Sequence, residues 1–254
     1  MKNQRRLVQN QSSLVAEQLR QLSRIYVLIQ KHRCRYDNLV GSKLEYLQDT
    51  DKWKKFFERN SKTFKETEIG LKKELEELVK QHEWGNYLLN IKGVGAGIAG
   101  SIIGELCGNI YAHIEKDNKK IGGKMPKPKL LGYGPRKFEK TSDLWAYAGF
   151  TVNNGKAVRR KRGEAFSHNS YLKLICYKFA VNQVKQGDYY RKLYVKRLEY
   201  EAKRQPEWYL GKKVNNKGKE YDSYSLHCRR RAERYIIKKF LSNVNHHLVL
   251  KNAK

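Results

Sequence analysis

The sequence has little proline, little cysteine and no long apolar run. Four prolines and four cysteines occur in 254 residues. Three prolines fall between residues 118 and 140, so long helices can form elsewhere. The cysteines are far apart and form no C-x-x-C pair, and reduced, buried or semi-buried thiols are the favoured interpretation. No apolar run approaches the roughly 18 residues of a membrane span, so we expect no membrane contact.

We also expect no secretory leader. The basic start MKNQRR is followed by the polar run QNQSS, where a signal peptide needs an apolar core. We therefore expect a cytoplasmic protein.

Acidic residues are scarce relative to basic ones. The 54 Lys and Arg against 25 Asp and Glu leave a net charge of +29. Residues 151–254 carry 26 basic and 8 acidic side chains, net +18, against +6 for residues 1–90 and +5 for residues 91–150. Because compaction of like charges costs free energy, the excess predicts a polyanionic partner contacted mainly by the C-terminal part. A highly soluble, solvated surface is the alternative.

Helical patterns dominate what is present. Between about residues 14 and 89, apolar residues recur at steps of three and four. The predicted inward face of a first helix is Leu14, Leu19, Leu22, Ile25, Tyr26 and Ile29, and that of a second is Ile69, Leu71, Leu75, Leu78 and Val79. Asp49-Thr50-Asp51 predicts a break and a cap between them. The pairs Glu68–Lys72 and Glu76–Lys80 support the second helix.

The C-terminal part predicts further helices joined by basic loops. A helix is expected from Thr141 to Phe150, capped by Thr141 or Ser142 and ended by Gly149. Others are expected from Asn169 to about Arg204, with Leu172, Ile175, Cys176 and Phe179 inward, and from about Tyr224 to Leu250, with Leu226, Tyr235, Ile236, Phe240, Val244 and Leu248 on one face. Residues 118–140 and Gly211–Gly218 are expected to be basic loops. The Asn-Gly pair in TVNNGKAV predicts one short hairpin around Thr151–Arg160.

These patterns predict a mainly α fold, with a long N-terminal helical hairpin followed by a helical domain. We expect a helical arm over residues 1–85, for packing or dimerisation, and a basic domain over residues 86–254 with an inserted loop at about 111–140.

The segment LLNIKGVGAGIAGSIIGEL, residues 88–106, matches a helix-hairpin-helix. Gly93 and Gly95 permit a tight turn whose bare backbone N–H groups can approach a phosphate at a helix start. Val94 is expected to plug the space between the helices and Lys92 to add a charge; the expected DNA contacts are Lys92, Gly93, Val94, Gly95 and Gly97. A packing turn without DNA is the alternative. A dinucleotide-binding loop is disfavoured, because a helical run precedes the glycines where a strand is required.

Two further basic clusters are candidate phosphate contacts. The first is Lys156, Arg159, Arg160, Lys161 and Arg162, and the second is Arg229, Arg230 and Arg231 with Arg234. A run of four basic residues is also typical of a localisation signal or a solvated loop.

The segments IKGVGAGIAGSIIGEL, DLWAYAGFTVNNGKAVRRKRGE, SYLKLICYKFA and LHCRRRAERYIIKKFL carry a resemblance. Over roughly residues 85–250 the chain resembles the C-terminal, helix-hairpin-helix domain of the IS-one-ten / IS-one-sixteen group of insertion-sequence transposases, as a stand-alone relative without the RuvC-like domain. The resemblance implies DNA binding in transposition or recombination and a nucleoid-associated location.

Catalysis does not follow from the resemblance. Residues 1–85 are predicted to be helical and offer no sheet for metal-binding carboxylates. Asn153 and Asn154 hold the place of the family's serine, and an amide cannot form a phosphoserine link. The catalytic residues are therefore unknown, and whether the chain is an enzyme stays open. The alternatives are a recombinase using Ser167, Ser170 or a tyrosine, and an RNA-binding protein stacking bases on Tyr189–Tyr200.

We expect no cofactor, with a monovalent cation or Mg²⁺ at the hairpin phosphate left open. His32 with Cys34 and His227 with Cys228 lack the spacing of a zinc module, so no metal site is expected. The expected partners are DNA, contacted mainly through phosphates, with structured RNA as an alternative, and a second copy of the chain bound through the N-terminal helices.

Overall fold

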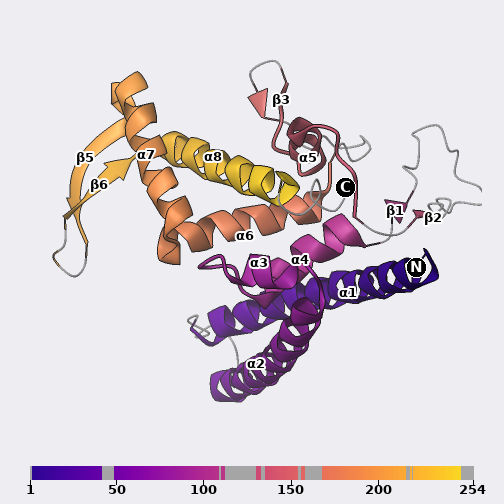
Figure 1. Ribbon diagram of the computed structural model, residues 1–254. Coiled ribbons are helices and arrows are strands. Elements are labelled where there is room, and N and C mark those ends of the chain that lie inside the picture. Colours follow the sequence, from indigo (N-terminus) through magenta and orange to yellow (C-terminus); the bar gives the residue numbers. More distant parts are fainter. Residues whose placement is uncertain are drawn as a thin grey trace, which may run out of the picture. The chain divides into compact units, whose positions relative to one another are not determined.

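The computed structural model describes residues 2–41, 49–108, 110–111, 130–132, 135–153, 156–157, 168–215, 218 and 220–246. The chain divides into two compact units, one of residues 1–89 and 95–135 and the other of residues 90–94 and 136–254. Eight α-helices account for most of the described residues (Figure 1), which confirms the mainly α prediction.

The first unit is built on two long helices, α1 (Lys2–Val40) and α2 (Thr50–Gln81), which pack against each other. Asp49, at φ 57°, marks the expected break before α2, but its side chain makes no capping hydrogen bond. The short α3 (Gly85–Leu89) and α4 (Ala96–Cys107) follow, and β1 (Ile110–Tyr111) pairs with β2 (Leu130–Gly132).

Helix α4 belongs to the first unit because its glycines let α1 approach closely. A Cβ built at Gly104 would lie 2.5 Å from the Cα of Arg20, and one built at Gly100 would lie 3.2 Å from the Leu19 side chain. Small residues at these positions allow near-backbone contact between the helices. The first unit therefore extends beyond the arm boundary expected at residue 85.

Three apolar residues expected to face inward are exposed. Leu14, Ile25 and Ile69 have exposed fractions of 61%, 46% and 50%. The buried face of α1 instead carries small residues, Ser13, Ala16 and Ser23, together with Leu19. The periodic pattern of large apolar residues did not predict this face, because its buried positions are mostly small residues.

One of the two ion pairs predicted within α2 is present. Lys80 and Glu76 lie 2.9 Å apart, as predicted. Glu68, expected to pair with Lys72, instead lies 2.6 Å from the Arg33 guanidinium of α1. The Glu68 carboxylate therefore joins α2 to α1.

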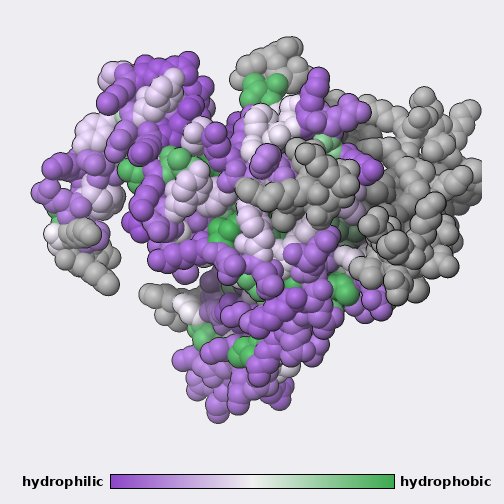
Figure 2. Space-filling view, in the orientation of Figure 1, coloured by the Kyte–Doolittle hydropathy of each residue, from purple (hydrophilic) through white to green (hydrophobic). Residues whose placement is uncertain are grey.

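The second unit is a helical body carrying small hairpins. Its elements are α5 (Thr141–Tyr147), β3 (Val152–Asn153), β4 (Lys156–Ala157), α6 (Ser170–Gln186), α7 (Tyr189–Arg204), the 3₁₀ turn η1 (Pro206–Trp208), β5 (Tyr209–Val214), β6 (Glu220–Tyr224) and α8 (Leu226–Val244). The predicted inward residues Leu172, Ile175, Cys176 and Phe179 are buried, and the Phe179 ring stacks on Phe240 at 4.0 Å. The surface facing the viewer in Figure 2 is mostly hydrophilic.

The ends of α5 match the prediction at one end only. Gly149 ends the helix at φ 75°, and the Phe150 N–H donates to the Trp145 carbonyl at 2.8 Å, as in a Schellman motif. At the start, Thr141 or Ser142 was expected to cap. The cap position is instead Lys140, whose N–H donates to the Asp143 carboxylate at 3.1 Å.

The strand predictions are partly wrong. The predicted short hairpin is present, with Asn153 paired to Lys156. Gly211–Gly218 was expected to be a loop, but β5 runs through it to Val214 and pairs with β6. Most residues of both strands are exposed, so their sequences lack the alternation of apolar and polar residues that predicts a strand.

Helix α8 (Leu226–Val244) lies within the expected range of about Tyr224 to Leu250, and residues 245–246 continue it as a π-helical turn. Leu226, which the sequence placed on its apolar face, is 61% exposed. Leu248 and Leu250 lie outside the described residues, as does most of the predicted loop at 118–140.

Candidate nucleic-acid interface

The segment between α3 and α4 forms the tight turn that the glycines indicated. Gly93 has φ 85°, a left-handed conformation that strains any residue with a side chain. The Val94 N–H donates to the Ile91 carbonyl at 2.9 Å, and Val94 is 5% exposed. The turn is thus closed by its own backbone and anchored by Val94.

Two amide side chains of α6 hold this turn. The Gln183 side chain donates to the Lys92 carbonyl at 2.8 Å, and the Asn182 side chain donates to the Gly93 carbonyl at 3.3 Å. A Cβ at Gly93 would lie 2.9 Å from the Gln183 Nε2 atom. The carbonyl groups of the turn are therefore satisfied within the protein, and its conformation is fixed.

The start of α4 presents N–H groups without acceptors. Gly95 is the N-cap residue, and no side chain caps the helix. Among the described residues, the N–H groups of Gly95, Ala96 and Gly97 have no hydrogen-bond acceptor. Gly95 is exposed, and a Cβ built on it would meet nothing within 4 Å. Such a helix start attracts anions.

Gly95, unlike Gly93, is not in the left-handed conformation. Its φ of −94° and ψ of 175° are extended values that any residue adopts. Gly93 alone supplies the left-handed residue of the turn. Gly95 is thus not required by backbone conformation or by packing.

Gly97 has a packing role. A Cβ built on it would lie 2.7 Å from the Tyr26 ring of α1. The packing interpretation of the glycine-rich segment therefore accounts for Gly97, Gly100 and Gly104, but not for the exposed Gly95.

Lys92 is exposed beside the turn. The pKa of the Asp188 carboxyl is lowered by the hydrogen bond and the charge of Lys192, and the Lys92 charge lowers it further.

The arginines at the start of α8 differ from one another. Arg231 lies 2.9 Å from the buried Glu201 carboxylate, which also accepts from Arg197. Burial raises the pKa of Glu201, but the hydrogen bonds from Arg231 and Arg197 outweigh it, so the pKa lies below its ordinary value. Arg230 pairs with Glu233 at 2.8 Å, whereas Arg229 is exposed. Arg229 is thus better placed than Arg231 to reach a ligand.

Other predicted site residues are placed only in part. Lys156 lies in β4, but Arg159, Arg160, Lys161 and Arg162 lie outside the described residues, as does Ser167. Ser170 is the first residue of α6, whose cap is Asn169. In α7, Tyr189 and Tyr200 are exposed, but Tyr190 and Tyr194 are buried. This distribution leaves two tyrosines of the predicted stacking segment on the surface.

The β5–β6 ribbon is a surface that the sequence interpretation missed. The two strands pair as an antiparallel ribbon (Figure 1). They carry Lys212 and Lys213 together with the exposed aromatic residues Tyr209 and Tyr221. The exposed strands carry no apolar alternation, so no periodic pattern in the sequence marked them. A two-stranded ribbon has dimensions that fit the major groove of DNA.

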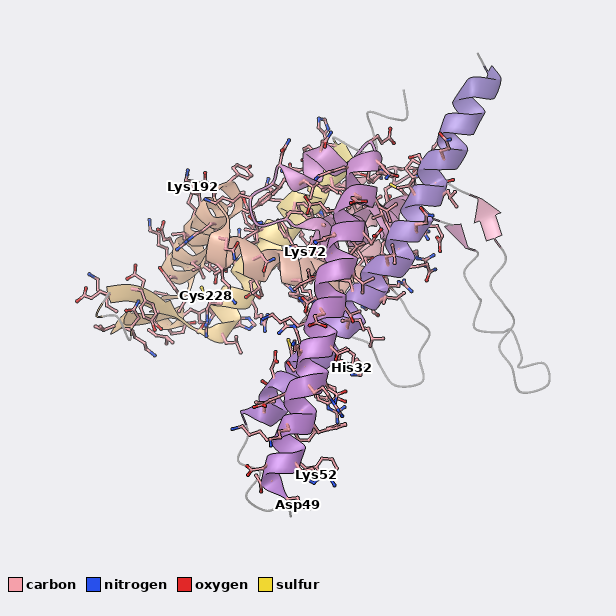
Figure 3. All side chains as sticks on the ribbon, turned by 90° about the horizontal axis from the view of Figure 1, so that it is seen from below. His32, Asp49, Lys52, Lys72, Lys192 and Cys228 are labelled. Atoms are coloured by element: carbon pink, nitrogen blue, oxygen red, sulfur yellow. The ribbon has the colours of Figure 1, made fainter. Side chains whose placement is uncertain are left out.

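The described residues include no group of three or more His, Cys, Asp or Glu side chains arranged to hold a metal ion. The His32 ring stacks on Phe64 at 5.6 Å, and the His227 ring meets Trp208 at 4.9 Å. Cys228 is buried and donates to the Leu198 carbonyl; Figure 3 labels His32 and Cys228.

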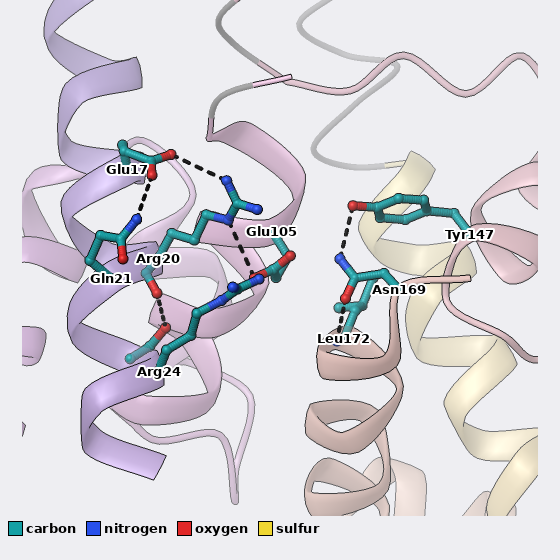
Figure 4. A network of polar contacts seen from close by, with 9 residues as sticks. Glu17, Arg20, Gln21, Arg24, Glu105, Tyr147, Asn169 and Leu172 are labelled. Carbon is teal, nitrogen blue, oxygen red and sulfur yellow. Dashed lines mark hydrogen bonds and ion pairs between the residues drawn. The ribbon is translucent and has the colours of Figure 1, made fainter. Parts of the chain in front are cut away.

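The buried carboxylate of the first unit is held by arginines. Glu105 lies 2.6 Å from Arg24 and 3.5 Å from Arg20, whose other carboxylate neighbour is Glu17 (Figure 4). Like Glu201, it is neutralised within its own unit. Both carboxylates thus have structural partners.

No helix among the described residues is both long and apolar enough to cross a membrane. Comparison of the chain with protein-family models, curated proteins and solved structures found no match.

Proposed function

We propose that this protein binds DNA through the sugar-phosphate backbone, with the turn at residues 92–95 and the start of α4 as the central contact. The observation that carries the proposal is Gly95. It is exposed, open to solvent at its Cα and followed by N–H groups that have no acceptor among the described residues. Packing explains the neighbouring glycines but not this one.

A phosphate at the start of α4 would receive hydrogen bonds from the backbone and attraction from the Lys92 charge. Backbone donors contact phosphate oxygens and read no bases, so they position the protein without selecting a sequence. The net charge of +29 supplies the remaining affinity through release of counterions. These properties support a sequence-independent grip on duplex DNA.

The resemblance to insertion-sequence transposases supports a role in transposition or recombination, in a cytoplasmic, nucleoid-associated setting. Asparagine stands where the resembling family has its serine, and this favours a binding role over catalysis. Asn153 lies in β3 and pairs with Lys156 in the hairpin, and its amide offers no nucleophile. We assign no catalytic residue.

A second copy of the chain is a further proposed partner. Helix α1 leaves Leu14, Ile25 and Leu28 exposed, and their spacing puts them on one side of the helix. We propose that this stripe pairs two copies. Sedimentation of the wild-type protein and of Leu28→Glu tests it, since a charge in the stripe should shift a dimer to monomer. A wild-type monomer would contradict the pairing.

The proposed function is tested by titrating the protein with random duplexes at several salt concentrations. The logarithm of the binding constant should fall by about 0.9 per logarithm of salt for each phosphate neutralised, with little difference between sequences. A flat salt dependence, or strong preference for one duplex, would contradict the proposal. Competition with single-stranded DNA and structured RNA distinguishes DNA binding from an RNA-binding role. Incubation with supercoiled plasmid and Mg²⁺ distinguishes a binding protein from an active recombinase, which would cut or rejoin the plasmid.

A further inference from the structure

The two long helices of the first unit continue past their buried core. The described buried residues of α1 lie between residues 13 and 23, and those of α2 are Leu75 and Val79. None of the described residues 24–41 and 50–74 is buried. We call the described residues 31–41 and 50–65 the arm tip; Figure 3 labels Asp49 and Lys52 at this end of the two helices.

Aromatic rings join the two helices of the arm tip. The centre of the Tyr36 ring of α1 lies 5.5 Å from that of Phe64 and 6.1 Å from that of Phe57, both of α2. Trp53 stacks on Phe57 at 6.1 Å, and Phe56 meets Phe57 edge to face at 5.7 Å. Tyr36, Phe57 and Phe64 are half-buried. Trp53 and Phe56 are 43% and 39% exposed, so contact between the helices accounts for the inner rings and leaves these two facing solvent.

Basic side chains accompany the two exposed rings. The segment KWKKFFER, residues 52–59, has three lysines and one arginine against a single acidic residue. Lys52, Lys55 and Arg59 follow one another at steps of three and four, which places them on the side of α2 that also carries Phe56. The guanidinium carbon of Arg59 lies 6.0 Å from the centre of the Phe56 ring. Rings and cations therefore share one surface.

The cations of this surface have no anionic partner in the described part of the chain. No carboxylate among the described residues lies at ion-pair distance from any of the three side chains. The Asp37 and Glu68 carboxylates of the same two helices are each engaged by Arg33 at 2.6 Å. The charges beside the exposed rings are thus available to an anion from outside the protein.

The composition of the arm tip favours a nucleic-acid strand over a lipid surface or a second copy. Residues 50–65 include four aromatic residues and no aliphatic one. A helix that lies on a membrane surface buries leucine or other aliphatic side chains along with its aromatic ones. The same residues carry six basic and two acidic side chains, net +4, so two such tips repel each other. Flat rings beside cations match single-stranded nucleic acid, whose unpaired bases stack on rings while its phosphates meet the cations.

We propose that the arm tip binds a single-stranded segment of nucleic acid. Unpaired bases stack on Trp53 and Phe56, and phosphates of the same strand lie against Lys52, Lys55 and Arg59. That the strand is DNA rests on the proposed function. The site differs from the turn before α4 in what it takes, because duplex DNA keeps its bases paired and stacked and offers none to these rings.

The test compares Trp53→Leu/Phe56→Leu with the control Ile69→Ala in the full chain. Leucine is apolar and favours helix but has no ring, so the double variant removes the stacking surface alone. Ile69 is 50% exposed on the same helix outside the arm tip, so its replacement controls for the loss of an exposed apolar side chain. Affinity for dye-labelled oligo(dT) should fall at least about tenfold in the double variant and not in the control. Circular dichroism should show equal helix content in all three proteins.

A second variant, Lys52→Gln/Lys55→Gln, tests the phosphate contacts. Its salt dependence for oligo(dT) should be less steep by about 0.7 for each lysine removed, whereas the leucine variant, which loses no charge, should keep the wild-type slope. Oligo(U) in the same titrations identifies the source of the strand. Tighter binding of oligo(U) than of oligo(dT) would keep the site and overturn its assignment to DNA.

These outcomes are separable from those for duplex DNA. If Trp53→Leu/Phe56→Leu binds oligo(dT) as tightly as Ile69→Ala does, the stacking site is refuted, whether or not the wild type binds duplexes. If the leucine variant loses oligo(dT) affinity while no form binds duplex DNA, the site stands and the proposed function fails. Unchanged oligo(dT) affinity with a loss of binding to phosphatidylserine vesicles, or of self-association in sedimentation, would assign the rings to a lipid surface or a second copy instead.

Discussion

The side-chain amide of Gln183 donates a 2.8 Å hydrogen bond to the carbonyl oxygen of Lys92, 91 residues earlier in the chain. Gln183 is only 1% exposed, so the donor side of this bond is shielded from water. It satisfies the carbonyl of the residue that opens the proposed DNA-binding turn. A buried polar side chain of α6 thus sets the conformation of a surface turn.

Replacement of Gln183 by Leu should therefore loosen the turn. The leucine keeps the volume but leaves the Lys92 carbonyl without its donor, at a cost of about 1–3 kcal/mol in the free energy of unfolding. DNA affinity should fall while the salt slope stays unchanged, because no charge is altered. Asn182→Ala is the matched control, and its weaker 3.3 Å bond predicts a smaller effect. Equal stability and affinity for wild type and Gln183→Leu would show that the bond does not organise the turn.

Gly93→Ala tests the left-handed position of the turn. At φ 85°, and with a Cβ 2.9 Å from Gln183 Nε2, alanine should cost about 1–2 kcal/mol of folding free energy. Gly95→Ala, at an extended and open position, should be close to neutral. Chemical denaturation of the two variants checks the difference. Equal stabilities of the two variants would show that Gly93 does not need a left-handed conformation in the folded protein.

His82 should make the first unit sensitive to mild acid. It is buried, and the Trp84 N–H donates to its Nδ1 atom, so the neutral ring is the favoured form. Burial lowers its pKa from 6.5 to about 4. Because the unfolded chain takes up the proton first, stability should fall by about 3 kcal/mol as the pH drops from 6.5 to 4. Denaturation across this range should show the loss in the wild type and a shallower one in His82→Gln.

Glu201→Gln should destabilise the second unit. The carboxylate is buried between Arg197 and Arg231, so its removal leaves two guanidinium groups without their anion, at about 2–3 kcal/mol near pH 7. The lowered pKa of Glu201 means that this stabilisation is present above pH 4.5 and disappears as the pH falls through the folded-state value. The difference between the two proteins should therefore narrow in acid. A constant difference from pH 7 to pH 3 would contradict this assignment.

Much of the helical fold follows from local patterns. The break at Asp49, the end of α5 at Gly149 and the buried face of α6 were predictable because turn chemistry and apolar spacing act over a few residues. The β5–β6 ribbon was not, because its exposed strands carry no apolar alternation. The packing of α4 against α1 was not predicted either. It depends on Gly104 lying against the backbone of Arg20, a contact between residues far apart in the sequence.

The candidate site was predictable in its chain position but not in its supports. Gly93, Val94 and Gly95 mark the turn in the sequence. Nothing local indicates that Gln183 fixes it, or that Arg231 is engaged by Glu201 and so differs from Arg229. These relationships depend on which helices pack together, which single-sequence patterns do not encode.

The most direct test of DNA binding at the turn compares Gly95→Asp with Gly95→Asn. Both side chains fit the open N-cap position and should cap α4, but only aspartate adds a negative charge where the phosphate is proposed to lie. We expect two folded proteins of similar stability, with duplex DNA affinity at least tenfold lower for Gly95→Asp, about 1.4 kcal/mol, than for Gly95→Asn. If both variants are folded and bind duplex DNA with equal affinity, the turn does not contact DNA.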